Sequence, residues 1–183
     1  TAHLERALPA FGYEERMSDR IIIVGGGNIG LFLTRELETR YPHLLIKVIE
    51  GNAERAETIA DELHRAVVLC GDARDRALLD EANVKNAQAI VTVTNDDEVN
   101  IMAGLLAKRL GCSRALALVN NSTYNLILGV IGLDVAINPR ETTVSSVLQH
   151  VRRGRLKSVH TIRDGEAEIY EAEALETSPL VGK

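Results

Sequence analysis

Short apolar runs alternate with longer amphipathic stretches along most of the chain, from residue 20 to residue 137. The apolar runs predict strands over 21–24, 45–50, 66–70, 89–93, 115–119 and 135–137. The stretches between them predict helices over 28–40, 53–63 and 76–81, a helix that begins within 94–98 and continues through 110, and a helical stretch over 122–128. Strands that alternate with helices in this way are typical of a parallel sheet covered on both faces. The sequence therefore predicts an α/β fold, a doubly wound six-stranded sheet of the Rossmann type.

The first predicted helix carries apolar residues at regular spacing. Ile29, Leu33 and Leu37 are four residues apart, so they are predicted to face the sheet. The helix is expected to stop before Pro42, because the residue before a proline is biased away from helical geometry.

The turn at 94–98 gathers acidic residues where the fourth helix begins. Asn95 and Glu98 have the spacing of a capping box, and acidic side chains are favourable near the positive end of a helix. Asp96 and Asp97 are therefore interpreted as part of a solvated capping cluster rather than as paired catalytic carboxylates.

The chain changes character after the sixth predicted strand. Pro139 stands where a first helical position is expected, and the helix that follows carries an apolar stripe. The stripe comprises Val144, Val147, Leu148 and Val151. It either contacts a partner subunit or packs within its own chain. Beyond it, Asp164-Gly165 is a hairpin turn signal between a strand that contains Val159 and Ile162 and one that contains Ala167, Ile169 and Tyr170.

These patterns divide the chain into segments. We expect a linker or the tail of a preceding domain over 1–19, a nucleotide-binding domain over 20–138, a connecting helix over 139–154, and the truncated start of a small α+β C-terminal domain over 155–183.

Charge and cysteine content exclude several classes of protein. A net charge of −5 argues against a protein that binds nucleic acid phosphates. Cys70 and Cys112 form no metal-binding cluster and no disulfide framework, so a reduced cytoplasmic setting is expected. The chain shows no signal peptide and no apolar run long enough to cross a bilayer. Direct membrane insertion is therefore not expected, and a membrane role would be exercised through a partner.

The candidate chemistry centres on the glycine cluster that follows the first strand. In a dinucleotide-binding turn, Gly25 would allow the tight turn, Gly27 the close approach of a pyrophosphate, and Gly30 close packing of the helix. The phosphates would lie at a helix N-terminus, where free N–H groups and the helix dipole favour negative charge.

The second strand ends in an acidic residue, Glu50, twenty positions after Gly30, where a ribose-binding carboxylate is expected. A carboxylate accepts hydrogen bonds from ribose hydroxyls and repels a 2′-phosphate, which favours NAD(H) or an adenine nucleotide over NADP(H). Arg55 either softens this preference or is an exposed helix residue paired with an acidic neighbour.

Polar residues after the next three predicted strands complete the candidate site. They are Gly71, Asp72, Ala73, Thr94, Asn95 and Asn120. Ligands of open α/β sheets bind beyond the carboxyl ends of the strands, and Asp72 with its two neighbours is placed to flank the adenine. Cys70, directly before them, is interpreted as a small buried residue at a strand end.

Residues for turnover of a bound cofactor are not evident. Hydride transfer needs a proton donor or acceptor set against the nicotinamide. None of the four tyrosines is followed four residues later by a lysine, and none of the five histidines ends a central predicted strand. We therefore expect binding without turnover, no catalytic residue and no metal. A small NAD-dependent oxidoreductase is the alternative, and a redox-responsive transcription factor is disfavoured because no basic recognition helix is present.

Several motifs together resemble the TrkA family, the regulatory subunits of Trk-type bacterial potassium uptake, also called the RCK/KTN family. They are IIIVGGGNIG at 21–30, the strand that ends at Glu50, VLCGDA at 68–73, TNDDEVNIM at 94–102, DVAINP at 134–139 and HVRRG at 150–154. The match covers nearly the whole chain, and the combination is more specific than any of its parts.

The resemblance implies a cytoplasmic homo-oligomer, a dimer or ring, that lies peripheral to the inner membrane. It would dock on a membrane potassium transporter of the TrkH/TrkG kind and adjust its opening as nucleotide binds. Family members contain two successive halves, and this chain resembles the second. The implied nucleotide contacts are Gly25, Gly26, Gly27, Asn28, Ile29, Gly30, Glu50, Gly71, Asp72, Thr94, Asn95 and Asn120. Relatives that favour ATP carry a basic residue in the glycine turn; Asn28 lacks that charge, which favours NAD(H) and leaves ATP or ADP as the alternative.

Overall fold

The computed structural model describes residues 19–124, 130–151, 156–162 and 167–172. The chain divides into two units, 1–137 and 138–183. Asn138, predicted as the last residue of the nucleotide-binding domain, falls at the start of the second unit. The segment predicted as a linker, 1–19, lies outside the described residues except for Asp19.

The first unit is built on a parallel sheet in the order β3-β2-β1-β4-β5-β6. The strands are β1 (Arg20–Val24), β2 (Leu45–Glu50), β3 (Val67–Cys70), β4 (Ala89–Thr92), β5 (Arg114–Leu118) and β6 (Val135–Ile137). The chain winds outward from β1 to β3 and then returns to the other side of β1 for β4. This order confirms the predicted doubly wound fold, and it places a crevice between β1 and β4, where the strand order reverses.

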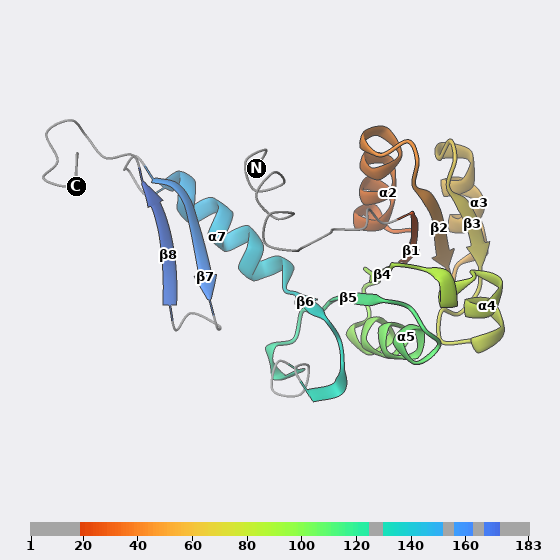
Figure 1. The fold of residues 1–183 in the computed structure, drawn as a ribbon. Helices are drawn as coiled ribbons and strands as arrows, with labels where there is room; N and C mark the ends of the chain where they lie inside the picture. Colours follow the sequence, from red (N-terminus) through yellow and green to blue (C-terminus); the bar gives the residue numbers. More distant parts are fainter. Residues whose placement is uncertain (1–18, 125–129, 152–155, 163–166, 173–183) are drawn as a thin grey trace, which may run out of the picture. The chain divides into compact units, whose positions relative to one another are not determined.

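Helices cover both faces of this sheet (Figure 1). They are α2 (Asn28–Arg40), α3 (Ala53–Glu62), α4 (Arg76–Glu81) and α5 (Asp97–Arg109), with short 3-10 turns η2 (Val84–Asn86) and η3 (Ser122–Tyr124). Successive residues of β1 point to opposite faces: Ile23 packs in one apolar cluster with Ile59 of α3, and Ile22 packs in another with Leu79 of α4 and Ala103 of α5. Each side of β1 therefore has its own core. The predicted continuation of the helical stretch to residue 128 lies outside the described residues.

The buried face of α2 differs from the prediction by one residue. Ile29 is 49% exposed, whereas Leu33 and Leu37 are partly buried against the α2–α3 core, as predicted. The fully enclosed positions of the helix are one residue further along, at Gly30 and Thr34. The reason is the glycine turn before the helix, which draws the backbone at Gly30 inward and turns Ile29 outward.

The cap of α5 also differs from the predicted capping box. The N-cap is Asp96, whose carboxylate accepts hydrogen bonds from the amides of Glu98 and Val99 at 2.9 and 3.0 Å. Asp97 is not a solvated capping residue, because its carboxylate accepts the amide of Asn120 at 3.0 Å, across the sheet edge. The acidic turn thus ties α5 to the loop after β5.

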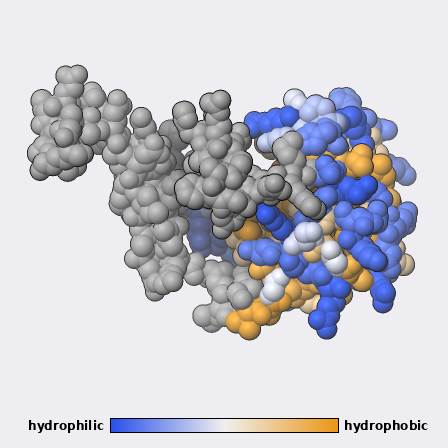
Figure 2. All heavy atoms as spheres, viewed as in Figure 1, coloured by the Kyte–Doolittle hydropathy of each residue, from blue (hydrophilic) through white to orange (hydrophobic). Residues whose placement is uncertain are grey.

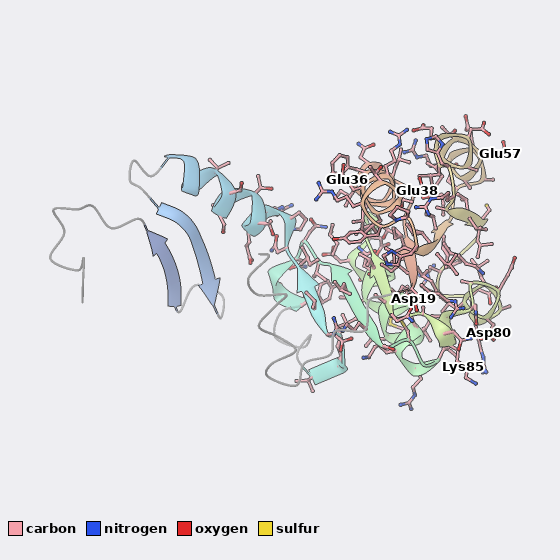
Figure 3. The ribbon with its side chains drawn as sticks, turned by 45° about the horizontal axis from the view of Figure 1, so that its top comes forward. Asp19, Glu36, Glu38, Glu57, Asp80 and Lys85 are labelled. Atoms are coloured by element: carbon pink, nitrogen blue, oxygen red, sulfur yellow. The ribbon has the colours of Figure 1, made fainter. Side chains whose placement is uncertain are left out.

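At the amino ends of the strands, the carboxylate of Glu38 binds the backbone of the loop that leads into β3. Glu38 of α2, labelled in Figure 3, is only 8% exposed and accepts the amides of His64, Arg65 and Ala66 just before β3. Burial alone would raise the pKa of Glu38, but these amides and the charge of Arg65 outweigh it, so the pKa lies below its ordinary value.

At the same edge, a second carboxylate accepts a backbone amide just before β6. Asp134 accepts the amide of Ala115 at 2.7 Å and pairs with Lys108 at 3.0 Å. Burial opposes ionisation of this carboxyl group, and the two partners reverse that effect and lower its pKa.

The second unit contains α7 (Pro139–Val151) and an antiparallel hairpin of β7 (Leu156–Ile162) and β8 (Ala167–Ala172). The predicted helix and hairpin strands are confirmed, whereas the predicted turn at Asp164-Gly165 lies outside the described residues. Of the apolar stripe, Val144 and Val147 are more than half exposed, and the side chains of the other two members are not among those described.

Hydrophilic side chains predominate on the face of the first unit seen in Figure 2, with hydrophobic ones in smaller areas among them. Within the described ranges, no helix combines the length and hydrophobicity that a membrane span requires.

Candidate nucleotide-binding site

A pocket of about 630 Å³ opens at the carboxyl ends of β1 to β4. Its lining residues come from the ends of these strands and from the turns that follow them. They are Val24, Gly25, Gly27, Ile49, Glu50, Gly51, Asn52, Arg55, Gly71, Asp72, Ala73, Arg74, Val93, Thr94, Asn95, Asp96 and Val99. The pocket includes the crevice between β1 and β4, which is the usual ligand position in an open α/β sheet.

The turn after β1 depends on two glycines. Gly25 has a φ of +103°, and a Cβ there would lie 3.0 Å from the amide nitrogen of Thr94. A Cβ on Gly30 would lie 1.8 Å from the carbonyl oxygen of Gly25. The predicted roles of Gly25 in the turn and of Gly30 in close packing are confirmed, and the close contact at Gly30 is with the turn itself.

Gly27 is the N-cap of α2 and has no side chain that could cover the first amides of the helix. It caps the helix without a side-chain hydrogen bond, and no atom lies within 4 Å of a Cβ built on it. The first intrahelical bond runs from the amide of Leu31 to the carbonyl of Gly27 at 2.9 Å, so the preceding amides have no acceptor inside the helix. These amides and the positive end of the helix dipole form a favourable position for a phosphate group.

The backbone of Gly26 is held by hydrogen bonds at both its N–H and its carbonyl group. Its N–H donates to Oε2 of Glu50 at 2.6 Å, and its carbonyl accepts from Nε of Arg55 at 2.8 Å. Oε1 of Glu50 also accepts the amide of Asn52, the N-cap of α3, at 2.8 Å. Glu50 thus shapes the glycine turn as well as lining the pocket, a second task that the spacing from Gly30 did not reveal. Arg55 bonds a backbone carbonyl, and it forms no ion pair with an acidic residue in the part of the chain that the structure describes.

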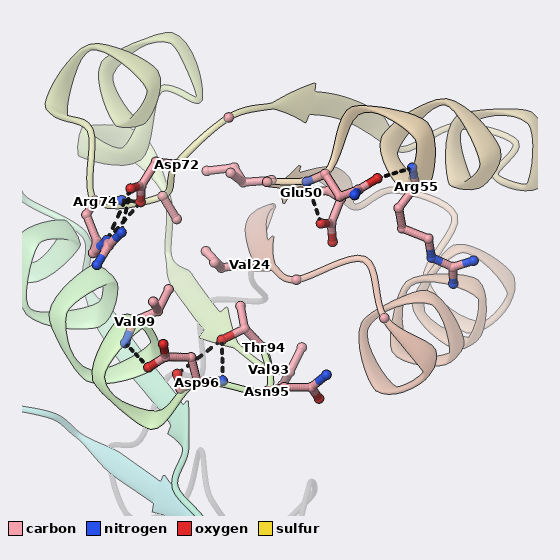
Figure 4. Close-up of a pocket in the computed structure, with 17 residues that line it drawn as sticks. Val24, Glu50, Arg55, Asp72, Arg74, Val93, Thr94, Asn95, Asp96 and Val99 are labelled. Carbon is pink, nitrogen blue, oxygen red and sulfur yellow. Dashed lines mark hydrogen bonds and ion pairs between the residues drawn. The ribbon is translucent and has the colours of Figure 1, made fainter.

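A second carboxylate and arginine lie on the opposite side of the pocket, after β3 (Figure 4). Asp72 and Arg74 form a two-point ion pair, with Nη2 to Oδ2 at 2.7 Å and Nε to Oδ1 at 3.0 Å. The hydrogen bonds from Arg74 lower the pKa of Asp72 to about 2. Asp72 is therefore charged at neutral pH. Because both side chains of the pair are half exposed, the ion pair contributes little to the stability of the fold.

A buried asparagine on α5 supports the β4 side of the pocket. Asn100 is fully enclosed; its Oδ1 accepts the amide of Thr94 at 2.9 Å and the hydroxyl of Thr94 at 2.7 Å, and its Nδ2 donates to the carbonyls of Thr94 and Leu118. Asn100 stands inside the motif at 94–102, but the sequence assigned it no role. Its function depends on contacts across the sheet, which no local pattern encodes.

The structure gathers some of the predicted contact residues and separates others. The predicted residues that line the pocket are Gly25, Gly27, Glu50, Gly71, Asp72, Thr94 and Asn95. Gly26, Asn28, Ile29 and Gly30 belong to the turn and the start of α2 without lining it. Asn120 lies beside Asp97 in a separate, smaller hollow of about 420 Å³ that shares Asn95 and Asp96 with the pocket. Among the lining residues that the sequence did not predict are Asn52, Arg74, Asp96 and Val99.

Cys70 is exposed, so its prediction as a buried residue is wrong. It ends β3, which forms one edge of the sheet and is covered less completely than the central strands. Among the residues with described positions, no group of His, Cys, Asp and Glu could hold a metal ion.

Taken together, the pocket offers amide donors and an arginine at the glycine turn, carboxylates after β2 and β3, and an apolar floor that includes Val24, Ile49 and Val93. A ligand with anionic, hydroxyl and flat apolar parts matches these features. The family model of the TrkA-N domain matches residues 21–139. The chain belongs to the TrkA-N family. The match confirms the resemblance inferred from the sequence motifs.

Known proteins similar to this TrkA-N chain include one named Trk system potassium uptake protein TrkA, from Azorhizobium caulinodans. The two are 54% identical over 178 residues, which is 97% of this chain and 39% of the relative. The chain thus spans about two fifths of the length of that relative.

Solved structures share the TrkA-N fold at lower identity. The GsuK channel bound to NAD is 22% identical with a TM-score of 0.63, covering 83% of this chain and 27% of the channel chain. The Kef C-terminal domain from Shewanella denitrificans, solved in an AMP-bound form, is 16% identical with a TM-score of 0.59, covering 72% of this chain and 79% of the domain.

Proposed function

We propose that this TrkA-N chain binds an adenine nucleotide, NAD(H) in the first place, as the regulatory part of a potassium-uptake system. The observation that carries the proposal is the glycine turn at the crevice between β1 and β4, where Gly27, the N-cap of α2, lines a pocket that also holds Glu50. The 54% identity to a relative named Trk system potassium uptake protein TrkA supports the potassium-uptake context.

In this proposal the nucleotide acts as a signal and is not consumed. A ligand shifts a conformational equilibrium only by binding one state more tightly than the other. Nucleotide in the pocket would bias the orientation of neighbouring domains in a cytoplasmic homo-oligomer, and α7 would pass this bias to a membrane potassium transporter of the TrkH/TrkG kind. The predicted contacts, including Asn28, Ile29 and Asn120, are part of the proposal.

A second ligand class is supported by two observations. The likeness to a domain solved with AMP and the position of Arg55 at the glycine turn both suit ADP or ATP. Calorimetric titration with NAD⁺, NADH, ADP and ATP distinguishes the two classes.

The binding site is tested most sharply at Gly27. Its Cβ direction is open and its backbone is extended, with φ −68° and ψ −170°, so Gly27→Asp keeps the fold and supplies a good helix cap. Its carboxylate lies at the phosphate position, so we expect loss of at least about 100-fold in nucleotide affinity. The matched control is Gly27→Asn, which has the same shape without the charge and retains binding within several-fold. Equal binding by both variants would contradict a phosphate site at this turn.

The regulatory role is tested with the full-length protein in cells. Potassium uptake with the Gly27→Asp variant should lose its dependence on cellular nucleotide, whereas the Gly27→Asn variant should retain it. Steady oxidation of NADH by the purified wild-type protein with a small metabolite would instead favour an oxidoreductase.

A further inference from the structure

The charged side chains that line the pocket differ in the hydrogen-bond and ion-pair partners that compensate their charges. The carboxylates are those of Glu50, Asp72 and Asp96, and the cations are Arg55 and Arg74. Glu50 and Asp96 each accept two backbone amides, and Asp72 is paired with Arg74. Within the described part of the chain, Arg55 is the lining cation that no carboxylate neutralises.

Two hydrogen bonds hold Arg55, one at the start of α3 and one at the glycine turn. Its amide donates to Oδ1 of Asn52 in the first turn of α3, and its Nε donates to the carbonyl of Gly26 at 2.8 Å. The Nη groups of Arg55 make no hydrogen bond to another described residue. Arg55, a partly buried residue with unused guanidinium donors, therefore lies beside the glycine turn and lines the pocket.

The positive charge available without Arg55 is small. A helix N-terminus provides about half an elementary charge, whereas the diphosphate of a nucleotide carries roughly two or more. Asn28 is uncharged, and Glu50 adds a negative charge nearby. An arginine fork is the side chain best suited to neutralise such a group, because it forms charge-assisted hydrogen bonds to phosphate oxygens.

We propose that Arg55 binds the 5′-diphosphate of the ligand and makes the site select diphosphates, including dinucleotides, over nucleosides. This inference rests on the proposed function of the pocket. Arg55 acts at the diphosphate rather than at a ribose 2′-phosphate, because its Nε bond anchors it to the turn and the carboxylate of Glu50 repels a phosphate on the ribose.

The test separates the charge of Arg55 from its bond to Gly26. Arg55→Gln retains a donor for the Gly26 carbonyl without the charge, and Arg55→Lys retains the charge. Arg76→Gln is the matched control, because it removes the charge of an exposed arginine that does not line the pocket. Adenosine, ADP, NAD⁺ and NADP⁺ are titrated into the wild type and each variant by calorimetry, and melting curves verify the fold.

We expect Arg55→Gln to weaken ADP and NAD⁺ about 10- to 100-fold and adenosine less than about threefold. Arg55→Lys should recover most of the ADP affinity. Arg76→Gln should leave the ratio of ADP to adenosine affinity unchanged. The ADP affinity of the wild type should also fall more steeply with added salt than that of Arg55→Gln.

Several results would overturn the inference. Equal losses for adenosine and ADP would mean that Arg55 only shapes the turn, and unchanged affinities would mean that it does not contact the ligand. A loss confined to NADP⁺ would assign Arg55 to the ribose 2′-phosphate. A wild-type protein that binds none of the four ligands would overturn the proposed function as well, whereas wild-type binding without the predicted selectivity overturns only the role of Arg55.

Discussion

Carboxylates accept backbone amides at both edges of the sheet, but their surroundings differ between the amino edge and the carboxyl edge. At the amino edge, Glu38 is enclosed by the loop amides that it accepts, and Asp134 accepts the amide of Ala115 in β5. At the carboxyl edge, Glu50 also accepts two amides, yet it borders a pocket of about 630 Å³. Carboxylates that bind backbone amides can therefore close an edge or shape an open one.

The difference lies in the residues around each carboxylate. Glu38 is covered by the chain before β3, and Arg65 bonds the carbonyl of Glu38 itself, so the loop closes over the group. Glu50 faces glycines, and the open direction at Gly27 leaves no side chain to fill the space. The amino edge should therefore influence stability alone, and the carboxyl edge both stability and binding.

The largest effect is expected at Gly30, where the carboxyl edge depends on a close backbone approach. Gly30→Ala places a Cβ 1.8 Å from the carbonyl oxygen of Gly25, which the backbone must move to accommodate. We expect a loss of about 3 kcal/mol or more in the free energy of unfolding, measured by urea denaturation. Gly27→Ala, whose Cβ meets nothing, should cost less than about 1 kcal/mol. Equal losses would contradict the close packing at Gly30.

Substitution of Asn100 tests whether one residue at this edge supports both the stability of the fold and nucleotide binding. Asn100→Ala leaves the part-buried amide of Thr94 and the carbonyl of Leu118 without their partners. The expected loss in unfolding free energy is about 2 to 3 kcal/mol, with weaker nucleotide binding, because Thr94 lines the pocket. Asn95→Ala is the exposed control and should change stability by less than about 0.5 kcal/mol. If Asn100→Ala binds nucleotide as the wild type does, the support of Thr94 is not needed for the site.

The smallest loss in unfolding free energy is expected for substitution of Glu38, which tests the role of the amino edge. Glu38→Gln should cost about 1 to 2 kcal/mol at pH 7 by removing charge-assisted hydrogen bonds, and nucleotide affinity should not change. The pKa of Glu38 is lower in the folded state, so its stabilisation is complete above the ordinary value of 4.5 and is lost as the pH falls through the folded pKa. The stability difference between wild type and variant should therefore shrink below about pH 4.5.

The control for Glu38→Gln lies on the same helix. Glu36→Gln removes an exposed ion pair with Arg40 and should cost less than about 0.5 kcal/mol at any pH. A difference for Glu38→Gln that stays constant down to pH 3 would contradict the lowered pKa.

Local sequence determined much of this fold. The helix over 28–40 was predicted to the residue, because glycines precede it and Pro42 follows it. The glycine turn and Glu50 were found by spacing, since each depends on a short segment of chain with a defined geometry.

Long-range contacts were not predictable in the same way. The cap of α5 at Asp96, the bond from Asp97 to Asn120 and the enclosure of Asn100 depend on which strands lie side by side. Ile29 was assigned to the wrong face because helical spacing ignores the inward pull at Gly30, and Cys70 because apolar composition does not reveal an edge strand. The ion pair of Arg74 with Asp72, in contrast, has a local signal in the sequence, namely opposite charges two residues apart in a turn.

The hydrogen bonds from Glu50 and Arg55 to the backbone of Gly26 affect how much conformational entropy is lost when a ligand binds. A Cβ at that position would lie 2.3 Å from Cδ1 of Ile59, so α3 also packs directly on this peptide. The turn is thus already rigid before a ligand arrives, and little conformational entropy remains to be lost on association. A modest number of contacts can then give useful affinity, which suits a receptor that must release its ligand as readily as it captures it.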